Sequence, residues 1–112
     1  MQASKRILIS AVLAAPMFFF ASFSAAYADR LSDGRAIAER WCVSCHDIGA
    51  GDTRTAKDVA PTFESVAHRP NLSREHLETW IGNPHPPMPN MHLTREEIEN
   101  LVEYIESLKT AH

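Results

Sequence analysis

Both cysteines of this 112-residue chain lie in one short stretch, WCVSCH, which spans Trp41 to His46. Two thiols separated by two residues, with a histidine directly after them, have few uses in proteins. Three chemistries use such spacing: a dithiol–disulfide switch, a zinc site and the covalent attachment of haem. Each makes a different demand on the surrounding sequence, so the rest of the chain can decide between them.

The start of the chain has the layout of a secretory signal peptide. Two basic residues precede an apolar run that ends at Phe23, and a small-x-small cleavage site ends at Ala28. The alternative is a permanent membrane anchor, but the run is slightly short of the roughly 20 residues that span a bilayer, and Pro16 interrupts it. We therefore expect residues 1–28 to be a cleavable signal peptide and residues 29–112 to be a mature domain without a membrane segment.

The expected mature domain has an unusually small apolar content. Leu, Ile, Val and Phe supply 16 of its 84 residues, and 14 acidic residues against 9 basic ones give it a net charge of −5. An apolar content below about 20% with such a charge is typical of disordered chains. Helical patterns argue instead for a folded domain, and a folded domain with so small a core usually needs a metal, disulfides or a cofactor.

The clearest helical pattern lies near the C-terminus. Thr94 followed by Glu97 is a capping box, which marks the start of a helix. Behind it, apolar residues recur at the spacing of one helix face: Ile98, Leu101, Val102, Ile105 and Leu108. The glutamates of this segment are best interpreted as a solvated face.

Two further helices, and a short turn around residues 61–67, are predicted upstream. A helix from about residue 33 to 44, capped by Ser32 or Asp33, places the cysteine motif at its C-terminal end. Another begins at the cap Ser73 and runs over residues 74–81. The side chains expected to face the core are Ile37, Ala38, Trp41, Phe63, Val66, Leu77, Trp80 and Ile81. No stretch alternates like a strand, so the chain is predicted to be a single all-α domain with long loops.

This organisation selects among the three chemistries. A thiol switch needs its motif at the start of a helix that follows a strand, whereas here the motif ends a helix. Zinc needs two more ligands, and the other histidines show no paired ligand spacing. C-x-x-C-H is the attachment signal of haem c: Cys42 and Cys45 form thioethers with the porphyrin, and His46 binds iron. One haem c would also complete the small core.

The second axial ligand of the iron is expected in a proline-rich strap, PHPPMPNMHL, from Pro84 to Leu93. Its prolines stiffen the backbone, which suits a loop that must hold a soft thioether against iron. Met88 and Met91 both qualify, because a polyproline-like segment with three residues per turn can project both to the same side. Local geometry leaves the choice between them open.

The chain resembles the class I c-type cytochromes, the small bacterial monohaem type, over nearly all of the expected mature domain. Gly34 stands eight residues before Cys42, and Tyr104 follows on the last helix, as in that family. The resemblance implies the cytochrome c fold: three to four short helices around one covalently bound haem, with Gly34 letting the last helix approach closely. It also implies Met88 as the ligand, because Met88 precedes a proline and lies sixteen residues before Tyr104.

The same resemblance implies further roles around the haem. Pro61 matches the proline whose carbonyl accepts the proton of the histidine ligand, a bond that orients the ring and tunes the metal. Trp80 and Arg69 match positions that hydrogen-bond haem propionates. The alternatives are a core tryptophan and a surface arginine. His85 or His92 could replace methionine on the iron, although exposed loop histidines are commoner.

The predicted function is electron transfer in the periplasm by a monomeric protein with His46 and Met88 on the iron, and not catalysis. The mature domain holds two lysines, Lys57 and Lys109, so a lysine ring that docks on an acidic partner is not expected. Redox partner proteins would meet the exposed haem edge through a mainly apolar patch, and no nucleic acid is expected to bind. The alternatives are a cytochrome subunit of a larger periplasmic oxidoreductase, and a haem sensor or weak peroxidase with a labile sixth ligand.

Overall fold

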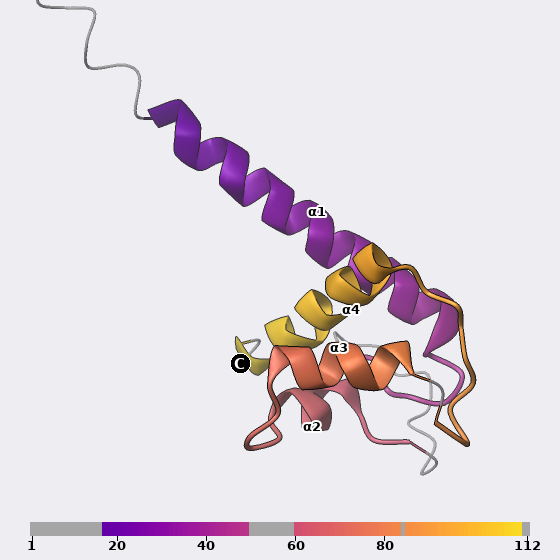
Figure 1. Ribbon diagram of the computed structural model, residues 1–112. Coiled ribbons are helices and arrows are strands. Elements are labelled where there is room, and N and C mark those ends of the chain that lie inside the picture. Colours follow the sequence, from indigo (N-terminus) through magenta and orange to yellow (C-terminus); the bar gives the residue numbers. More distant parts are fainter. Residues whose placement is uncertain (1–16, 50–59, 84, 111–112) are drawn as a thin grey trace, which may run out of the picture.

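The structure is a computed structural model that describes residues 17–49, 60–83 and 85–110. These residues form α1 (Met17–Trp41), α2 (Phe63–Ala67), α3 (Arg74–Gly82), α4 (Arg95–Ser107) and the short 3₁₀ helix η1 (Leu108–Thr110) (Figure 1). The only strand-like pairing in the described part is an isolated bridge between His85 and Met88. The all-α prediction is therefore confirmed.

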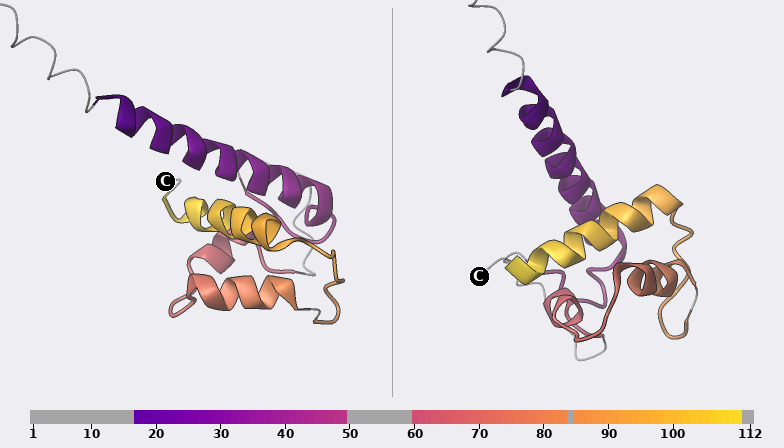
Figure 2. Two further views of the ribbon diagram at one scale, coloured as in Figure 1. Left: turned by 45° about the horizontal axis from the view of Figure 1, so that its top comes forward. Right: turned by 60° about the vertical axis from the view of Figure 1, so that its left-hand side comes forward.

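Helix α4 is the centre of the arrangement. It contacts α1 on one side and α2 and α3 on the other, and its contact with α1 is the most extensive (Figures 1 and 2). The N-terminal half of α1 extends away from the other helices, where Phe23 is 83% exposed. The C-terminal half of α1 is therefore the part of this helix that packs against α4.

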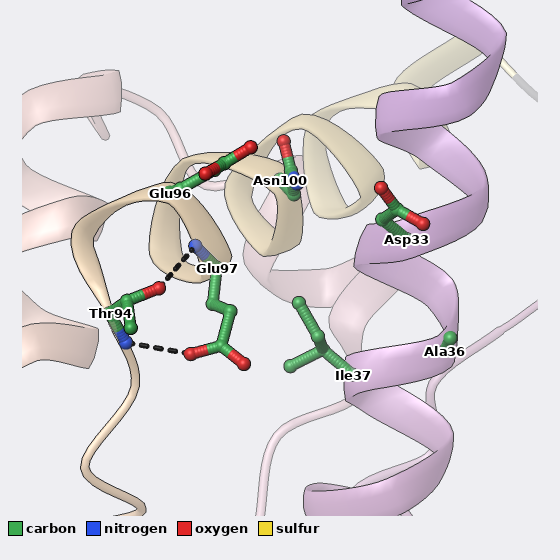
Figure 3. Close-up of a pocket in the computed structure, with 7 residues that line it drawn as sticks. All are labelled: Asp33, Ala36, Ile37, Thr94, Glu96, Glu97 and Asn100. Carbon is green, nitrogen blue, oxygen red and sulfur yellow. Dashed lines mark hydrogen bonds between the residues drawn. The ribbon is translucent and has the colours of Figure 1, made fainter.

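The predicted capping box at the start of α4 is confirmed. The Thr94 hydroxyl accepts from the Glu97 backbone N–H at 3.2 Å, and the Glu97 carboxylate accepts from the Thr94 N–H at 2.7 Å (Figure 3). Two of the N–H groups at the helix start are thereby satisfied. Four of the five predicted core residues of this helix face are buried (Leu101, Val102, Ile105 and Leu108), and Ile98 is half-buried.

The two shorter helices also begin at side-chain caps. The Ser73 hydroxyl accepts from the His76 N–H at 3.1 Å and starts α3 where the sequence predicts. The Thr62 hydroxyl accepts from the Ser65 N–H at 3.0 Å and starts α2. Because α2 begins directly after residues 60–62, its cap also fixes the backbone around Pro61.

The predicted start of the first helix is wrong. Ser32 and Asp33 do not cap it; both are exposed residues within α1, which runs without a break from Met17. Residues 21–31 contain no glycine or proline to stop a helix, and alanine supplies several of them. The predicted cleavage site at Ala28 lies within this helix, and residues 1–16 of the predicted signal peptide lie outside the described residues. None of the described helices is long and apolar enough to cross a membrane.

Gly34 allows α1 and α4 to cross at very short range. A Cβ atom placed there would lie 2.0 Å from the Asn100 carbonyl oxygen and 2.9 Å from the Cβ of Tyr104, both on α4. Real Cβ atoms do not approach a main-chain oxygen so closely. The crossing therefore requires glycine at this position, as the family resemblance implies.

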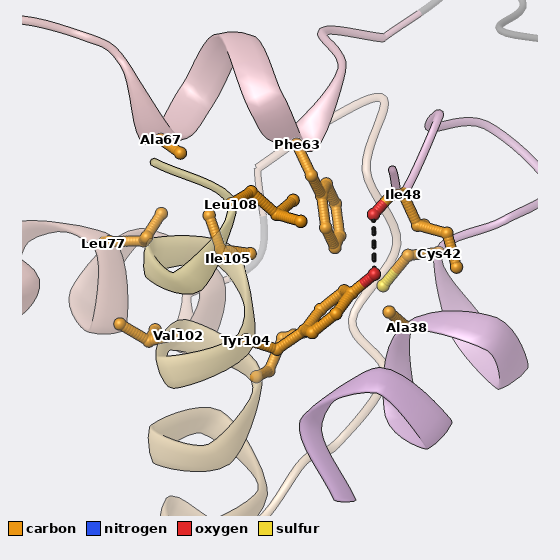
Figure 4. Close-up of a cluster of buried hydrophobic side chains, with 11 residues drawn as sticks. Ala38, Cys42, Ile48, Phe63, Ala67, Leu77, Val102, Tyr104, Ile105 and Leu108 are labelled. Atoms are coloured by element: carbon orange, nitrogen blue, oxygen red, sulfur yellow. Dashed lines mark hydrogen bonds between the residues drawn. The ribbon is translucent and has the colours of Figure 1, made fainter. Parts of the chain in front are cut away.

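The buried core joins all four α-helices to η1 and to the loop after α1. It consists of Ala38, Cys42, Ile48, Phe63, Ala67, Leu77, Leu101, Val102, Tyr104, Ile105 and Leu108, most of which Figure 4 labels. Other predicted core residues are partly buried and pack against this cluster: Ile37, Val66, Ile81 and Ile98. The two predicted tryptophans do not, since Trp41 is 44% exposed and Trp80 is 54% exposed. Trp41 is the last residue of α1, and the Arg40 guanidinium lies 4.9 Å above its ring. The Trp80 ring packs against the rings of His76 and His85.

Arginines pair with the predicted solvated glutamates of α4. Arg74, on α3, binds the carboxylate of Glu103 and lies 3.4 Å from that of Glu106. Arg95 lies 2.8 Å from Glu99, one turn further along α4. Much of the negative charge on this face is therefore balanced within the domain, and the pairs involving Arg74 also join α3 to α4.

Candidate haem-binding site

The cysteine motif forms a tight turn at the end of α1. The Cys42 N–H donates to the Ala38 carbonyl at 2.9 Å, and the His46 N–H donates to the Cys42 carbonyl at 2.9 Å. Both thiols are free: Cys42 is buried and Cys45 is exposed. The predicted position of the motif, at the C-terminal end of a helix, is confirmed, and the turn brings two thiols and an imidazole together.

The environment of Cys42 argues against a thiol enzyme. Burial, and to a lesser degree the neighbouring Cys45, raises the pKa of the Cys42 thiol from 9.0 to about 11. A nucleophilic or redox-active cysteine needs the opposite, a lowered pKa that makes the thiolate available at neutral pH. The Cys42 thiol therefore lacks the low pKa that a thiol enzyme would need.

The His46 ring is oriented by a hydrogen bond to Pro61. Its Nδ1 lies 2.7 Å from the Pro61 carbonyl oxygen, and since a carbonyl only accepts, Nδ1 carries the proton. In a neutral ring Nε2 then holds a lone pair available to a metal. The Phe63 ring packs beside it, with ring centroids 5.4 Å apart. His46 thus has the tautomer and fixed orientation of a metal-binding histidine.

The backbone after His46 is also hydrogen-bonded to the segment around Pro61. The Phe63 N–H donates to the Asp47 carbonyl at 2.9 Å, and the Asp47 carboxylate accepts from the Gly49 N–H at 2.8 Å. Gly49 has φ +82°, a left-handed turn that favours glycine. The loop 46–49 is therefore held in one conformation by its own hydrogen bond and is joined to the start of α2 by another.

The methionine strap connects the end of α3 to the start of α4, and its first residue, Pro84, lies outside the described residues. Met88 and Met91 are both half-buried, so burial does not distinguish them. The His92 N–H donates to the Asn90 side chain at 2.8 Å, and His92 has φ +53°. Figure 1 and the left view of Figure 2 show the strap at the same end of the molecule as the turn after α1.

Trp80 and the strap are joined through His85. The His85 ring lies 4.4 Å from the Trp80 ring, and the His76 ring stacks on Trp80 at 6.3 Å. Because His85 is also bridged to Met88, Trp80 and Met88 belong to one corner of the molecule. Sequence reasoning missed this use of His85, which is half-buried, whereas His92 is an exposed loop histidine as expected.

The structure brings four of the predicted site residues together. Cys42, Cys45 and His46 share one turn, and Pro61 is hydrogen-bonded to the His46 ring. Among the described interactions, those of the His46 ring are with Pro61 and Phe63, while Met88 stands on a separate loop. Arg69 is exposed just after α2, with its backbone N–H donating to the Val66 carbonyl at 3.1 Å. The propionate roles of Arg69 and Trp80 stay predictions.

A hollow of about 320 Å³ lies elsewhere, where α1 crosses the start of α4 (Figure 3). Asp33 and Ile37 line it from α1, and Glu97 and Asn100 line it from α4. None of the predicted haem-binding residues lines it. The hollow is therefore a feature of the helix crossing and not of the cysteine turn.

Comparison with known proteins agrees with this geometry. The family model described as cytochrome C oxidase, cbb3-type, subunit III matches residues 29–105. Cytochrome c-552 of Bradyrhizobium diazoefficiens is 42% identical over 88 residues, which cover 79% of this chain and 84% of that protein. Cytochrome c oxidase subunit 2 of Bacillus sp. (strain PS3) is 30% identical over 91 residues, which cover 69% of this chain but 26% of that protein. No solved structure matches significantly.

The chain belongs to the small c-type cytochromes. Its cofactor is a covalently bound haem c with iron, and it is an electron-transfer protein with redox partners. The residues present fit that cofactor, because one turn presents two free thiols and a histidine whose Nε2 is free to bind a metal.

Proposed function

We propose that this protein is a periplasmic electron carrier that holds one electron on a single haem. Cys42 and Cys45 attach the porphyrin, and His46 and Met88 bind the iron. The observation that carries the proposal is the hydrogen bond from His46 Nδ1 to the Pro61 carbonyl at 2.7 Å, which leaves Nε2 for the metal directly after the two thiols. The bound haem iron supplies the chemistry, the gain and loss of one electron.

The chain's own residues set the conditions for that transfer. Pro61 makes His46 a stronger electron donor and holds its ring in one orientation. The prolines around Met88 keep the strap rigid, so that both ligands stay in place in either oxidation state. A thioether ligand raises the reduction potential. Trp80 and Arg69 serve the propionates in this proposal.

The proposed location follows from the N-terminal sequence, which has the layout of a secretory signal peptide ending at Ala28. We expect the mature protein to be monomeric and to meet its partners at the exposed haem edge through a mainly apolar patch. The pairing of Glu99 with Arg95, and of Glu103 with Arg74, balances part of the negative charge of α4 within the domain. Lys57, one of its two lysines, lies outside the described residues.

The absorption spectrum of the oxidised, exported protein tests the proposal. Methionine bound to ferric haem gives a weak far-red band, and we expect it in the wild type and in Met91→Ala but not in Met88→Ala. The two variants are matched, because both remove a half-buried strap methionine. Loss of the band in Met91→Ala alone would reassign the ligand. A wild type without the band that binds carbon monoxide readily would instead favour a sensor or weak peroxidase.

A second candidate function is that of a cytochrome subunit in a larger periplasmic oxidoreductase. The matching family model is described as an oxidase subunit, and the Bacillus relative is named as one. In that case the protein would co-purify with the other subunits from its native membrane or periplasmic extract at physiological salt. Recovery as a separate, haem-containing monomer would favour the free carrier.

A further inference from the structure

The loop that follows the haem motif is held from a second side, away from Pro61. The hydroxyl of Tyr104, in the middle of α4, donates a hydrogen bond of 3.0 Å to the Ile48 carbonyl in this loop (Figure 4). Both residues are buried, with 5% of Tyr104 and 1% of Ile48 exposed. The hydrogen bond spans 56 positions of sequence and connects the last helix to the residues directly after His46.

The aromatic rings provide a parallel connection. The Tyr104 ring lies 6.5 Å from the Phe63 ring at an edge-on angle of 61°, and the Phe63 ring lies 5.4 Å from His46. Phe63 also donates its N–H to the Asp47 carbonyl. Tyr104 therefore touches both walls of the space that holds His46: the loop 46–49 directly, and the start of α2 through Phe63.

The position of Tyr104 is itself fixed by the helix crossing. Its Cβ lies at the point where α4 meets Gly34, 2.9 Å from where a Cβ of Gly34 would be, and the side chain is 5% exposed. The helix crossing therefore places the Tyr104 side chain, and its hydroxyl donates to the Ile48 carbonyl from that place. If the Tyr104 hydroxyl is removed, the Ile48 carbonyl loses this donor while it is still buried. A buried carbonyl that has lost its donor destabilises the conformation that buries it.

We propose that Tyr104 is a positioning residue for the axial histidine: its hydroxyl holds the loop 46–49 in the register that allows His46 to bond Pro61. The proposal rests on the proposed role of His46 as an iron ligand. When the hydroxyl is removed, the Ile48 carbonyl moves toward water, and Asp47 and His46 move with it. The hydrogen bond to Pro61 then opens more often, and the imidazole becomes a weaker electron donor to the iron.

Tyr104→Phe, in the intact haem protein, removes the hydroxyl and keeps the ring. The first measurement is the exchange of the His46 Nδ1 proton with solvent, followed by NMR of histidine-labelled protein. We expect exchange to become roughly tenfold faster or more, the effect of leaving one buried carbonyl without its donor. The second measurement is the reduction potential, which we expect to rise, because a less electron-rich ligand stabilises ferric iron less.

The matched control is Val102→Ala. Val102 is fully buried on the same helix but packs toward Leu77, away from the loop 46–49 (Figure 4). The Val102→Ala substitution lowers the global stability without changing a contact of the loop 46–49. Exchange of the His46 Nδ1 proton should therefore accelerate no more than exchange of the core amides of α4, and the reduction potential should stay near the wild-type value.

The inference is wrong if Tyr104→Phe accelerates exchange of the His46 Nδ1 proton no more than exchange of the core amides, or if the reduction potential stays constant or falls. Failure of the proposed function looks different. In that case the wild type itself lacks the far-red band of a methionine ligand or the spectrum of a histidine-ligated haem, whatever the variant does. A wild type with the expected spectrum and a silent Tyr104→Phe variant would overturn only the positioning role.

Discussion

Replacing Gly34 by alanine tests the helix crossing on which the domain depends. The added Cβ would lie 2.0 Å from the Asn100 carbonyl oxygen, whereas close contacts between carbon and oxygen lie near 3.3 Å. Helices α1 and α4 must therefore separate by about 1.3 Å. The obstacle is main chain, so no side-chain rotation can relieve it, and the separation loosens the packing of Ala38, Leu101 and Tyr104.

The expected effect follows from two opposing terms. Overpacking of this kind costs up to about 3 kcal/mol, and at main chain we expect the upper end. The better helix propensity of alanine offsets about 1 kcal/mol of this. A net loss of about 2 kcal/mol in the free energy of unfolding corresponds to a Tm lower by about 8–16 °C for a domain of this size.

Gly82→Ala is the matched control. Gly82 ends α3, is exposed, and a Cβ there would meet the Ile98 side chain at an ordinary distance of 3.4 Å. We expect this variant to be as stable as the wild type or slightly more stable. Urea unfolding followed by far-UV circular dichroism gives both values at 25 °C. If Gly34→Ala lies within about 0.5 kcal/mol of Gly82→Ala, the close crossing is not required and the reasoning fails.

Three further predictions concern the surface, the cap and the cofactor. Arg74→Met should lower the free energy of unfolding by about 1–2 kcal/mol, because it leaves the half-buried Glu103 unpaired. Arg95→Met, at an exposed pair, should change the free energy of unfolding by less than about 0.5 kcal/mol. Equal effects of the two substitutions would contradict the assigned network. Hydrogen bonds from Thr94 lower the pKa of Glu97 below 4.5, so its contribution to stability is full above that value and is lost as the pH falls through the lowered pKa. Glu97→Gln should therefore lose less stability than the wild type between pH 5 and pH 3, and parallel curves would speak against the capping role. The wild-type chain produced without haem attachment should show little helical circular dichroism and no cooperative melting, because its apolar core is small; a cooperative transition would show that the helices need no cofactor.

Local signals predicted the parts of the fold that depend on neighbours in sequence. The caps at Ser73 and Thr94 were found because a hydroxyl and the N–H groups it binds lie within three residues. The start of α1 was mispredicted because the same local signal occurs at Ser32 and Asp33 without a helix start there. Ser32 and Asp33 have the chemistry of a cap, but nothing before them stops the helix that arrives from Met17.

The exposure of the two tryptophans could not be predicted from helical periodicity either. Trp41 and Trp80 fall on the apolar side of their helices, yet each lies near the end of its helix and is about half exposed. Helical period tells which way a side chain points, but whether another element lies there is a property of the assembled helices. The same holds for His85, whose contact with Trp80 joins α3 to the strap.

The sequence by itself determined the chemistry of this protein: two thiols and a histidine at the end of a helix, in a chain with too small a core of its own. Those features are local, because the spacing of the three groups and the apolar content need no tertiary contact to be recognised. Only the tertiary structure decided how tightly the histidine is held. The Pro61 carbonyl lies 15 residues from His46, and the Tyr104 hydroxyl lies 56 residues from the Ile48 carbonyl that it binds. These groups meet because α1 and α4 cross at Gly34, and no local preference specifies a contact between segments so far apart in the chain.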